Sequence, residues 1–190
     1  MKLLNLQEKR IKFLLGIIFA LLIISEAFGS SKAENISQLF TKVNPGLSVK
    51  TAKNYSEIIV DVCKKFNQDP YVIAAIIVHE STVNNKAVSK GGDYGLMQIH
   101  WNAHSKNVKK KFPKVKNAKG LFDARINILY GTEIFADCVS KKGSVKGGLL
   151  CYSAGNEKFA NKVLNTIKEL QAQDKNTSVK KSNTKTRKGK

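Results

Sequence analysis

The segment Asp69–Ser81, with the sequence DPYVIAAIIVHES, predicts a helix that ends in a single acidic residue. Asp69 is a preferred N-cap residue and Pro70 is favoured in the first helical turn, so the helix is expected to begin there. It is expected to end near Glu80, beside apolar neighbours and at the negative end of the helix dipole. Both surroundings disfavour a charged carboxylate and raise its pKa. A carboxyl group that keeps its proton near neutral pH can act as a general acid. The alternative interpretation is an exposed, ionised Glu at a helix end, without a chemical role.

A second informative segment follows at Asp93–Ile99, with the sequence DYGLMQI. Residues 84–105 lack helical periodicity and contain several glycines, so we expect a loop with at most a small hairpin around Gly91–Ile99. The segment supplies a second carboxylate, Asp93, and a side-chain amide, Gln98. Asp93 is also typical of a turn residue that bonds to the backbone beside the glycines. Together with the acidic residue of the helix, these groups predict a site that breaks a glycosidic bond.

The other helices are predicted from apolar periodicity and from helix start and stop signals. The predicted helices span residues 52–66, 70–80, 124–140, 144–154 and 157–172. Asp123 is the N-cap of the third, and Gly131 within it allows another element to approach closely. Residues 106–120 form a basic connection. The predicted fold is therefore mainly helical.

The N-terminal segment has the three parts of a secretory signal peptide. Positive residues precede the apolar run Phe13–Ile24, whose 12 residues are too few to span a bilayer comfortably, where about 20 are needed. Small residues follow, and Ala27–Gly29 and Ser31–Ala33 are candidate cleavage sites. A cleaved signal is favoured over a retained anchor, which predicts an exported protein of the periplasm or cell envelope.

The chain divides into four regions. These are a signal peptide at residues 1–29, a polar N-terminal arm at 30–50, a folded domain at 51–172 and a basic tail at 173–190. The arm is interrupted by Pro45-Gly46, so it is expected to be a loop or to dock loosely. The tail has almost no apolar residues, so it is expected to be disordered.

The chain contains three cysteines, Cys63, Cys138 and Cys151. They fit an exported protein with one disulfide and one free thiol; all three pairings remain open, and three buried apolar side chains are the alternative. His79-Glu80 does not open a zinc-protease motif, because the next required histidine is replaced by Val83. The pair His100 and His104 has no third ligand nearby. We therefore expect no metal and no cofactor.

The chain is strongly basic, with 33 Lys and Arg residues, 14 Asp and Glu residues and a formal net charge of +19. Clusters lie at Lys106–Lys119 and Lys175–Lys190, and a solvated surface explains each of them alone. The summed charge argues for an acidic partner, which is nucleic acid, anionic lipid or a polymer rich in carboxylates. The signal peptide and the lack of a recognition motif argue against nucleic acid.

Four blocks of the sequence resemble, in order and spacing, the soluble lytic transglycosylase family of the lysozyme superfamily. The blocks are Glu80-Ser81, Gly95-Leu96-Met97-Gln98-Ile99, Asn127-Ile128 with Gly131, and Tyr152-Ser153-Ala154-Gly155. The resemblance implies a mainly α, lysozyme-like α+β fold, with a helical bundle and at most a small hairpin beside the active-site groove. It implies that Glu80 is the sole catalytic acid and base. The implied substrate-binding residues are Ser81, Met97, Gln98 and Tyr152. Cys151 and Ser153 stand where Ala and Asn are more usual.

The resemblance implies a peptidoglycan lytic transglycosylase that cleaves the MurNAc-β-1,4-GlcNAc bond and forms 1,6-anhydro-MurNAc. Asp93 is also similar to the second carboxylate of animal-type lysozymes and to an Asp of the specialised transglycosylases of secretion and conjugation systems. Asp93 is therefore a further candidate substrate-binding residue, and a lysozyme-type muramidase that uses Glu80 and Asp93 is an alternative. A weakly active wall-binding assembly component is another. The implied partners are peptidoglycan glycan strands and components of a secretion or conjugation apparatus, and the basic tail is expected to touch the wall or anionic membrane.

Overall fold

The computed structural model describes residues 10–15, 17 and 32–187, without the side chains of residues 176–187. Within the predicted signal peptide, residues 10–15 and 17 are helical and exposed. The rest of that segment lies outside the described residues. None of the described helices has an apolar stretch long enough to cross a membrane.

The described chain is mainly helical and contains one small two-stranded hairpin, as the sequence predicted. In chain order the elements are α2 (Val49–Phe66), α3 (Pro70–Ser81), β1 (Asp93–Tyr94), β2 (Ile99–His100), α4 (Trp101–Lys111), the 3-10 helix η1 (Ala118–Phe122), α5 (Ala124–Lys142), α6 (Val145–Tyr152) and α7 (Glu157–Arg187). The strands pair antiparallel, with Asp93 opposite His100 and Tyr94 opposite Ile99.

The helices α3 and α5 begin where capping side chains satisfy their first backbone N–H groups. A carboxylate oxygen of Asp69 accepts the N–H of Tyr71 at 3.1 Å at the start of α3. Asp123 accepts the N–H of Ile126 at 3.0 Å at the start of α5. Both predicted helix starts are therefore confirmed.

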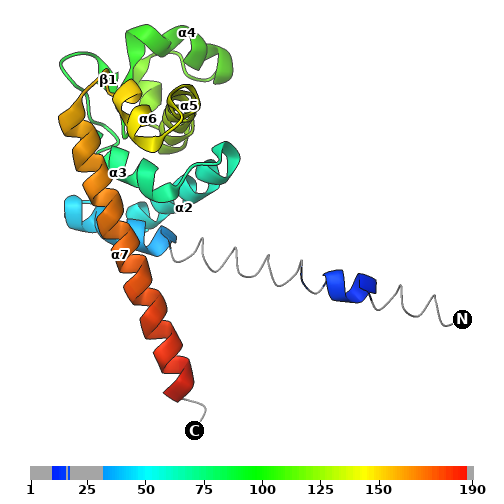
Figure 1. The fold of residues 1–190 in the computed structure, drawn as a ribbon. Helices are drawn as coiled ribbons and strands as arrows, with labels where there is room; N and C mark the ends of the chain where they lie inside the picture. The colour runs from blue at the N-terminus through cyan, green and yellow to red at the C-terminus, as the bar shows by residue number, and fades with distance from the viewer. Residues whose placement is uncertain (1–9, 16, 18–31, 188–190) are drawn as a thin grey trace, which may run out of the picture.

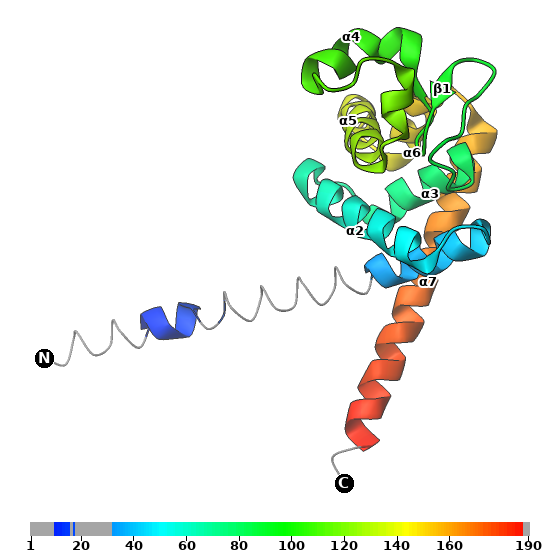
Figure 2. The same ribbon diagram turned by 180° about the vertical axis from the view of Figure 1, so that it is seen from behind.

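The helix α3 lies at the centre of the larger hydrophobic core. Every residue from Tyr71 to Ile77 is buried, because α2 and α7 both pack on this helix. The helix α5 packs against α2 and α6. Figures 1 and 2 show α4 and the hairpin at one end of the molecule, and α7 passing α3 and continuing beyond the body towards the C-terminus. A smaller core beside α4 contains Ile99, Val108, Val115, Leu121 and Tyr130.

The N-terminal arm differs from the expectation of a loop or a loosely docked segment. Residues 32–43 are helical, and Ile36 and Phe40 are fully buried in the larger core. With Leu39 and Val43, which also pack against that core, they have the spacing of an amphipathic helix. The expectation was wrong because this short stripe stands among polar residues and gains its stability from tertiary packing.

The helix α7 extends to Arg187, far beyond the predicted end at residue 172. The expectation of a disordered tail is therefore wrong for the backbone of residues 173–187. Leu170 is the last buried side chain of this helix in the described part of the chain. The extension adds one backbone hydrogen bond for each residue once the helix is nucleated. The helix α4 likewise begins at Trp101, where no helical periodicity was recognised.

Cys138 of α5 and Cys151 of α6 form a disulfide, and Cys63 is a buried free thiol. One disulfide and one free thiol were expected, and the structure selects among the pairings that the sequence left open. Burial, and after it the negative charge of Asp69, raises the pKa of Cys63 to about 12. The disulfide holds α6, which ends in Tyr152, against α5.

Candidate active site

Glu80 lies in the last turn of α3 and is half-buried. The helix ends at Ser81, and the next residue, Thr82, has a left-handed backbone and donates its N–H to the carbonyl of Val78 at 3.2 Å. Burial, and after it the negative charge of Asp93, raises the pKa of Glu80 from 4.5 to about 7. At neutral pH a substantial fraction of this carboxyl group is therefore protonated, as a general acid requires.

Asp93 is held by hydrogen bonds within the hairpin. The hydroxyl of Ser89 donates to Oδ2 of Asp93 at 2.5 Å, and Nδ1 of His100 lies 2.9 Å from Oδ1. The Ser89 oxygen accepts the backbone N–H groups of Gly91 and Asp93, each at 3.1 Å. The expectation that the Asp93 side chain bonds to the backbone is therefore wrong: its carboxylate bonds to two side chains, and Ser89 makes the backbone contacts. The charge of Asp93 also acts on Glu80.

Asn127 of α5 fixes the loop between the two strands. Its buried amide nitrogen donates to the carbonyls of Tyr94 and Leu121, and its amide oxygen accepts the N–H of Met97, all at 2.8 Å. Gly95 lies between these contacts with φ of +79°, and a Cβ at that position would lie 2.2 Å from Nδ2 of Asn127. Only glycine fits, because any side chain would displace the amide that orders the loop.

Met97 connects this loop to α5 and α6. Its side chain is fully buried over Gly131, where a Cβ would lie 2.6 Å from the Met97 sulfur, so the predicted close approach at this glycine is confirmed. The hydroxyl of Tyr152 donates to the Met97 carbonyl at 2.7 Å. Burial, followed by the charges of Glu80 and Asp93, raises the pKa of Tyr152 well above its ordinary value. Glu80, Asp93 and Tyr152 are therefore close enough to influence one another electrostatically. A contact of Met97 with sugar stays a prediction.

Two other predicted substrate-binding side chains contact the protein itself. Ser81 is buried, and its hydroxyl donates to the carbonyl of Ile77 at 3.2 Å. Gln98 is half-buried, and its amide nitrogen donates to the carbonyls of Gly95 at 2.8 Å and Ala87 at 3.3 Å. These bonds order the loop and the end of α3. Contacts of the two side chains with a sugar stay predictions.

His100 is a neighbour of the site to which the sequence assigned no role. The hairpin register places it opposite Asp93, where its ring meets the carboxylate. In the sequence, His100 and Asp93 are equally distant from the turn Gly95–Gln98. This spacing indicates that they are partners only once the register of the strands is known. His104 is close enough to His100 to be affected by its charge. Burial, and after it the charge of His100, lowers the pKa of His104.

The site combines a carboxyl group that exchanges its proton near neutral pH, a second carboxylate and a neutral phenol. Such a set can protonate a leaving oxygen and stabilise the positive charge that develops on a sugar. In the part of the chain that the structure describes, no three or more His, Cys, Asp or Glu side chains are grouped so that they could hold a metal ion.

Comparisons with known proteins identify similar sequences. A family model described as Transglycosylase SLT domain matches residues 57–178. The chain is 32% identical over 101 residues to the Membrane-bound lytic murein transglycosylase E of Buchnera aphidicola subsp. Acyrthosiphon pisum (strain APS). The match covers 50% of this chain and 44% of the relative, so the chain matches less than half of the relative's length. No solved structure matches the chain significantly.

Proposed function

The chain belongs to the transglycosylase SLT domain family, and from this premise we propose that it is a lytic transglycosylase of peptidoglycan. It cleaves the β-1,4 bond between N-acetylmuramic acid and N-acetylglucosamine and forms 1,6-anhydro-N-acetylmuramic acid. The single observation that carries the proposal is the half-buried carboxyl group of Glu80, whose pKa is raised to about 7.

In this proposal Glu80 acts first as an acid and then as a base. Its proton passes to the bridging oxygen, and the bond between that oxygen and the anomeric carbon breaks. Positive charge develops at the anomeric carbon, and the acetamido group of the substrate stabilises it. The Glu80 carboxylate then removes the proton of the C6 hydroxyl, whose oxygen bonds to the anomeric carbon. Glu80 regains its proton, and no water is consumed.

Tyr152 is assigned to hold the reacting sugar beside Glu80. Its hydroxyl proton is donated to the Met97 carbonyl, so the phenol oxygen is left to accept hydrogen bonds. The donors available to it are the N–H of the acetamido group and the protonated Glu80. Gln98 and Ser81 are assigned to orient the sugar and the acid from the ordered loop and the helix end.

Mass analysis of digested peptidoglycan tests the proposal. The full-length protein is expected to release anhydro products, which are lighter by one water than products of hydrolysis. Glu80→Gln is expected to lower the rate at least about 100-fold, whereas Glu57→Gln, at an exposed position of α2, leaves it unchanged. An unchanged rate in Glu80→Gln refutes the mechanism. Sedimentation with intact wall but no turnover in either protein supports the weakly active wall-binding component instead.

Hydrolysis by a lysozyme-type muramidase is the second candidate, favoured by the action of the Asp93 charge on Glu80. Both oxygens of Asp93 are already bonded to Ser89 and His100, which favours an electrostatic role over that of a nucleophile. Under the transglycosylase proposal, Asp93→Asn retains the anhydro product. The alkaline decline of its activity moves to lower pH, because the charge that raises the pKa of Glu80 is gone. Reducing-end products that disappear in Asp93→Asn establish hydrolysis.

We also propose the specialised role of opening the wall locally for a secretion or conjugation machine. The support is the resemblance at Asp93 to transglycosylases of such systems. Removal of the protein from its host is then expected to abolish secretion or conjugation while growth and wall turnover continue. Slower growth with intact secretion argues for general wall turnover. Crosslinking in the host identifies the partners of the machine.

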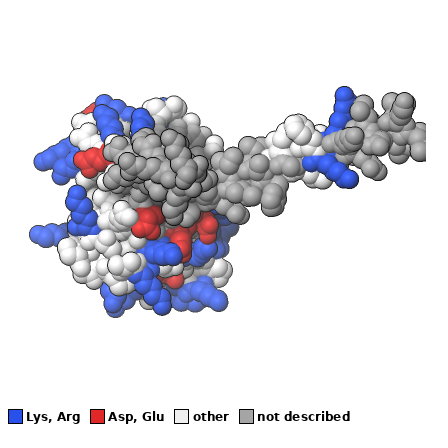
Figure 3. All heavy atoms as spheres, turned by 90° about the horizontal axis from the view of Figure 1, so that it is seen from below, with Lys and Arg blue, Asp and Glu red and all other residues white. Residues whose placement is uncertain are grey.

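We propose export to the cell envelope, with the basic tail touching the wall or anionic membrane. Peptidoglycan carries carboxylates that suit a chain of net charge +19, and Figure 3 shows Lys and Arg side chains spread around the visible face of the molecule. Fractionation of the host, with the N-terminus of the recovered protein read by mass spectrometry, tests export and cleavage. Intact mass and a cytoplasmic location refute both. Removal of residues 176–190 is expected to weaken sedimentation with wall or anionic vesicles.

A further inference from the structure

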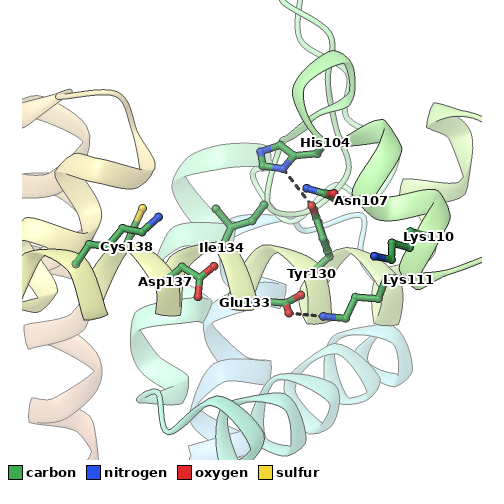
Figure 4. A pocket seen from close by; sticks show the side chains of 10 residues that line it. His104, Asn107, Lys110, Lys111, Tyr130, Glu133, Ile134, Asp137 and Cys138 are labelled. Carbon is green, nitrogen blue, oxygen red and sulfur yellow. Dashed lines mark hydrogen bonds and ion pairs between the residues drawn. The ribbon is translucent and has the colours of Figure 1, made fainter.

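A pocket of about 570 Å³ lies between α4 and α5. Figure 4 shows that its lining side chains come from facing sides of these two helices. None of the residues assigned to catalysis or sugar binding above lines it. The lining carries both signs of charge, although the chain as a whole is strongly basic.

The negative side of the pocket is incompletely satisfied. Glu133 and Asp137 are four residues apart on α5, a spacing at which like charges destabilise each other. One oxygen of Glu133 pairs with Lys111, whereas Oε2 is buried and has no hydrogen-bond partner among the described residues. Burial, with the charges of Glu133 and Asp137 among the further causes, raises the pKa of Tyr130. Both carboxylates line the pocket together with Tyr130, and a cationic donor placed beside the unpaired oxygen of Glu133 would be stabilised.

The positive side comes from both helices. Lys110 of α4 and Lys141 of α5 line the same pocket, and neither forms an ion pair with any described residue. A ligand that fits must therefore present an ammonium group to the two carboxylates and a carboxylate to a lysine. A polyanion is disfavoured, because Glu133 and Asp137 would repel it.

We propose that the pocket between α4 and α5 binds the peptide branch of peptidoglycan, through an amino acid that carries a free ammonium and a free carboxylate. The inference rests on the proposed function for the source of the ligand. His104 lines the pocket and lies within electrostatic reach of His100, whose ring contacts Asp93 of the candidate active site. The pocket is therefore linked to the candidate active site through His104 and His100, which favours a side branch of the polymer bound there as its ligand.

Calorimetry on the full-length Glu80→Gln protein tests binding without turnover. The probe is a wall tripeptide that ends in a diamino acid. The comparison probe is the same tripeptide with the free amine of its diamino acid acetylated. We expect the tripeptide to bind and acetylation to weaken binding about tenfold. Adding Glu133→Gln or Asp137→Asn is expected to weaken binding of the unmodified tripeptide by a similar factor. Adding Glu157→Gln is expected to have no effect, because Glu157 is an exposed acidic residue of α7. Absence of binding, or equal binding by all variants, overturns the proposal.

Kinetics separate this site from the catalytic one. With Glu80 intact, Glu133→Gln is expected to raise the KM for peptide-bearing glycan about tenfold and to leave kcat, and the KM for peptide-stripped glycan, unchanged. Equal effects on both substrates indicate a structural role and overturn the proposal. Lys141→Met, at an exposed position, repeats the test if Glu133→Gln unfolds. If the parent cleaves neither glycan, the proposed function fails while calorimetry still decides the pocket.

Discussion

Thr82 and Val83 adopt left-handed backbone conformations, with φ of 51° and 61°, directly after the helix that carries Glu80. Such a conformation is unfavourable for a β-branched residue and costs on the order of 1–3 kcal/mol. Val83 is fully buried, and its carbonyl accepts a hydrogen bond from Asn44 at 3.4 Å. Packing therefore maintains the turn. The turn stops α3 one residue after Glu80, so the acid stands at a helix end, within electrostatic reach of Asp93 in the hairpin.

The raised pKa of Glu80 has a consequence for stability. The folded protein holds this proton up to a pKa of about 7, whereas the ordinary value is 4.5. Stability therefore falls as pH rises between these values, and the full penalty remains above them. Glu80→Gln has no such charge, so it is expected to be about 1–3 kcal/mol more stable than wild type at pH 8, with no gain from this source at pH 4.

Urea unfolding at pH 4, 6 and 8 measures this difference. Glu57→Gln serves as the matched control, because Glu57 is exposed on α2 and its removal is expected to change stability by less than about 0.5 kcal/mol at each pH. A difference between Glu80→Gln and wild type that does not grow with pH would contradict the shifted pKa.

The helix α5 organises the site, although it carries no proposed catalytic group. Asn127 orders the loop between the strands, and Gly131 one turn later gives the Met97 side chain its place. The Met97 carbonyl then receives the Tyr152 hydroxyl from α6. The position of Tyr152 thus depends on α5 twice, through this loop and through the disulfide between α5 and α6.

Loss of the disulfide is expected to lower stability and activity together. Cys138 and Cys151 are 13 residues apart in sequence, and closing a loop of this length stabilises a protein by about 3 kcal/mol. Thermal unfolding with and without reductant measures the effect in wild type. The double variant Cys138→Ala, Cys151→Ala is expected to match the reduced protein and to ignore reductant. An equal response to reductant in both proteins would exclude this disulfide as its source.

Elements with local signals were predictable from the sequence. Asp69 and Asp123 mark helix starts through bonds to residues two and three positions away. The position of Glu80 at a helix end was predictable because it closes an apolar run of helical length. Contacts between distant residues were not predictable in this way. His100 meets Asp93 only through the strand register. The helix at 32–43 required knowledge of the core that it covers.

The helix at 32–43 and α7 meet at the start of α3. The amide of Asn35 donates to the Tyr71 hydroxyl at 3.0 Å and to Asp174 of α7 at 2.6 Å. Phe40 lies in the same helix as Asn35 and is fully buried. The helix at 32–43 and α7 thus both contact the helix that bears Glu80.

Phe40→Ala is expected to destabilise the protein by about 3–5 kcal/mol, as for other buried Phe residues. Val49→Ala, at an exposed position of α2, is the control, with an expected change below about 0.5 kcal/mol. Truncation after Lys175 is expected to be similarly mild, because Leu170 is the last buried side chain described in α7. Urea unfolding measures all three. A mild effect of Phe40→Ala would show that the arm is loosely docked after all.

One oxygen of Asp69 accepts both the backbone N–H that begins α3 and the ammonium group of Lys32, the latter at 2.8 Å. If the chain is exported and processed as proposed, the site of cleavage therefore bears on the helix that carries Glu80. A signal peptidase that cuts after Gly29 leaves this lysine in place. A cut after Ala33 removes it, so Asp69 loses its ionic partner and keeps only its capping bond. The choice between two processing sites four residues apart thus decides how firmly the acid-bearing helix is anchored.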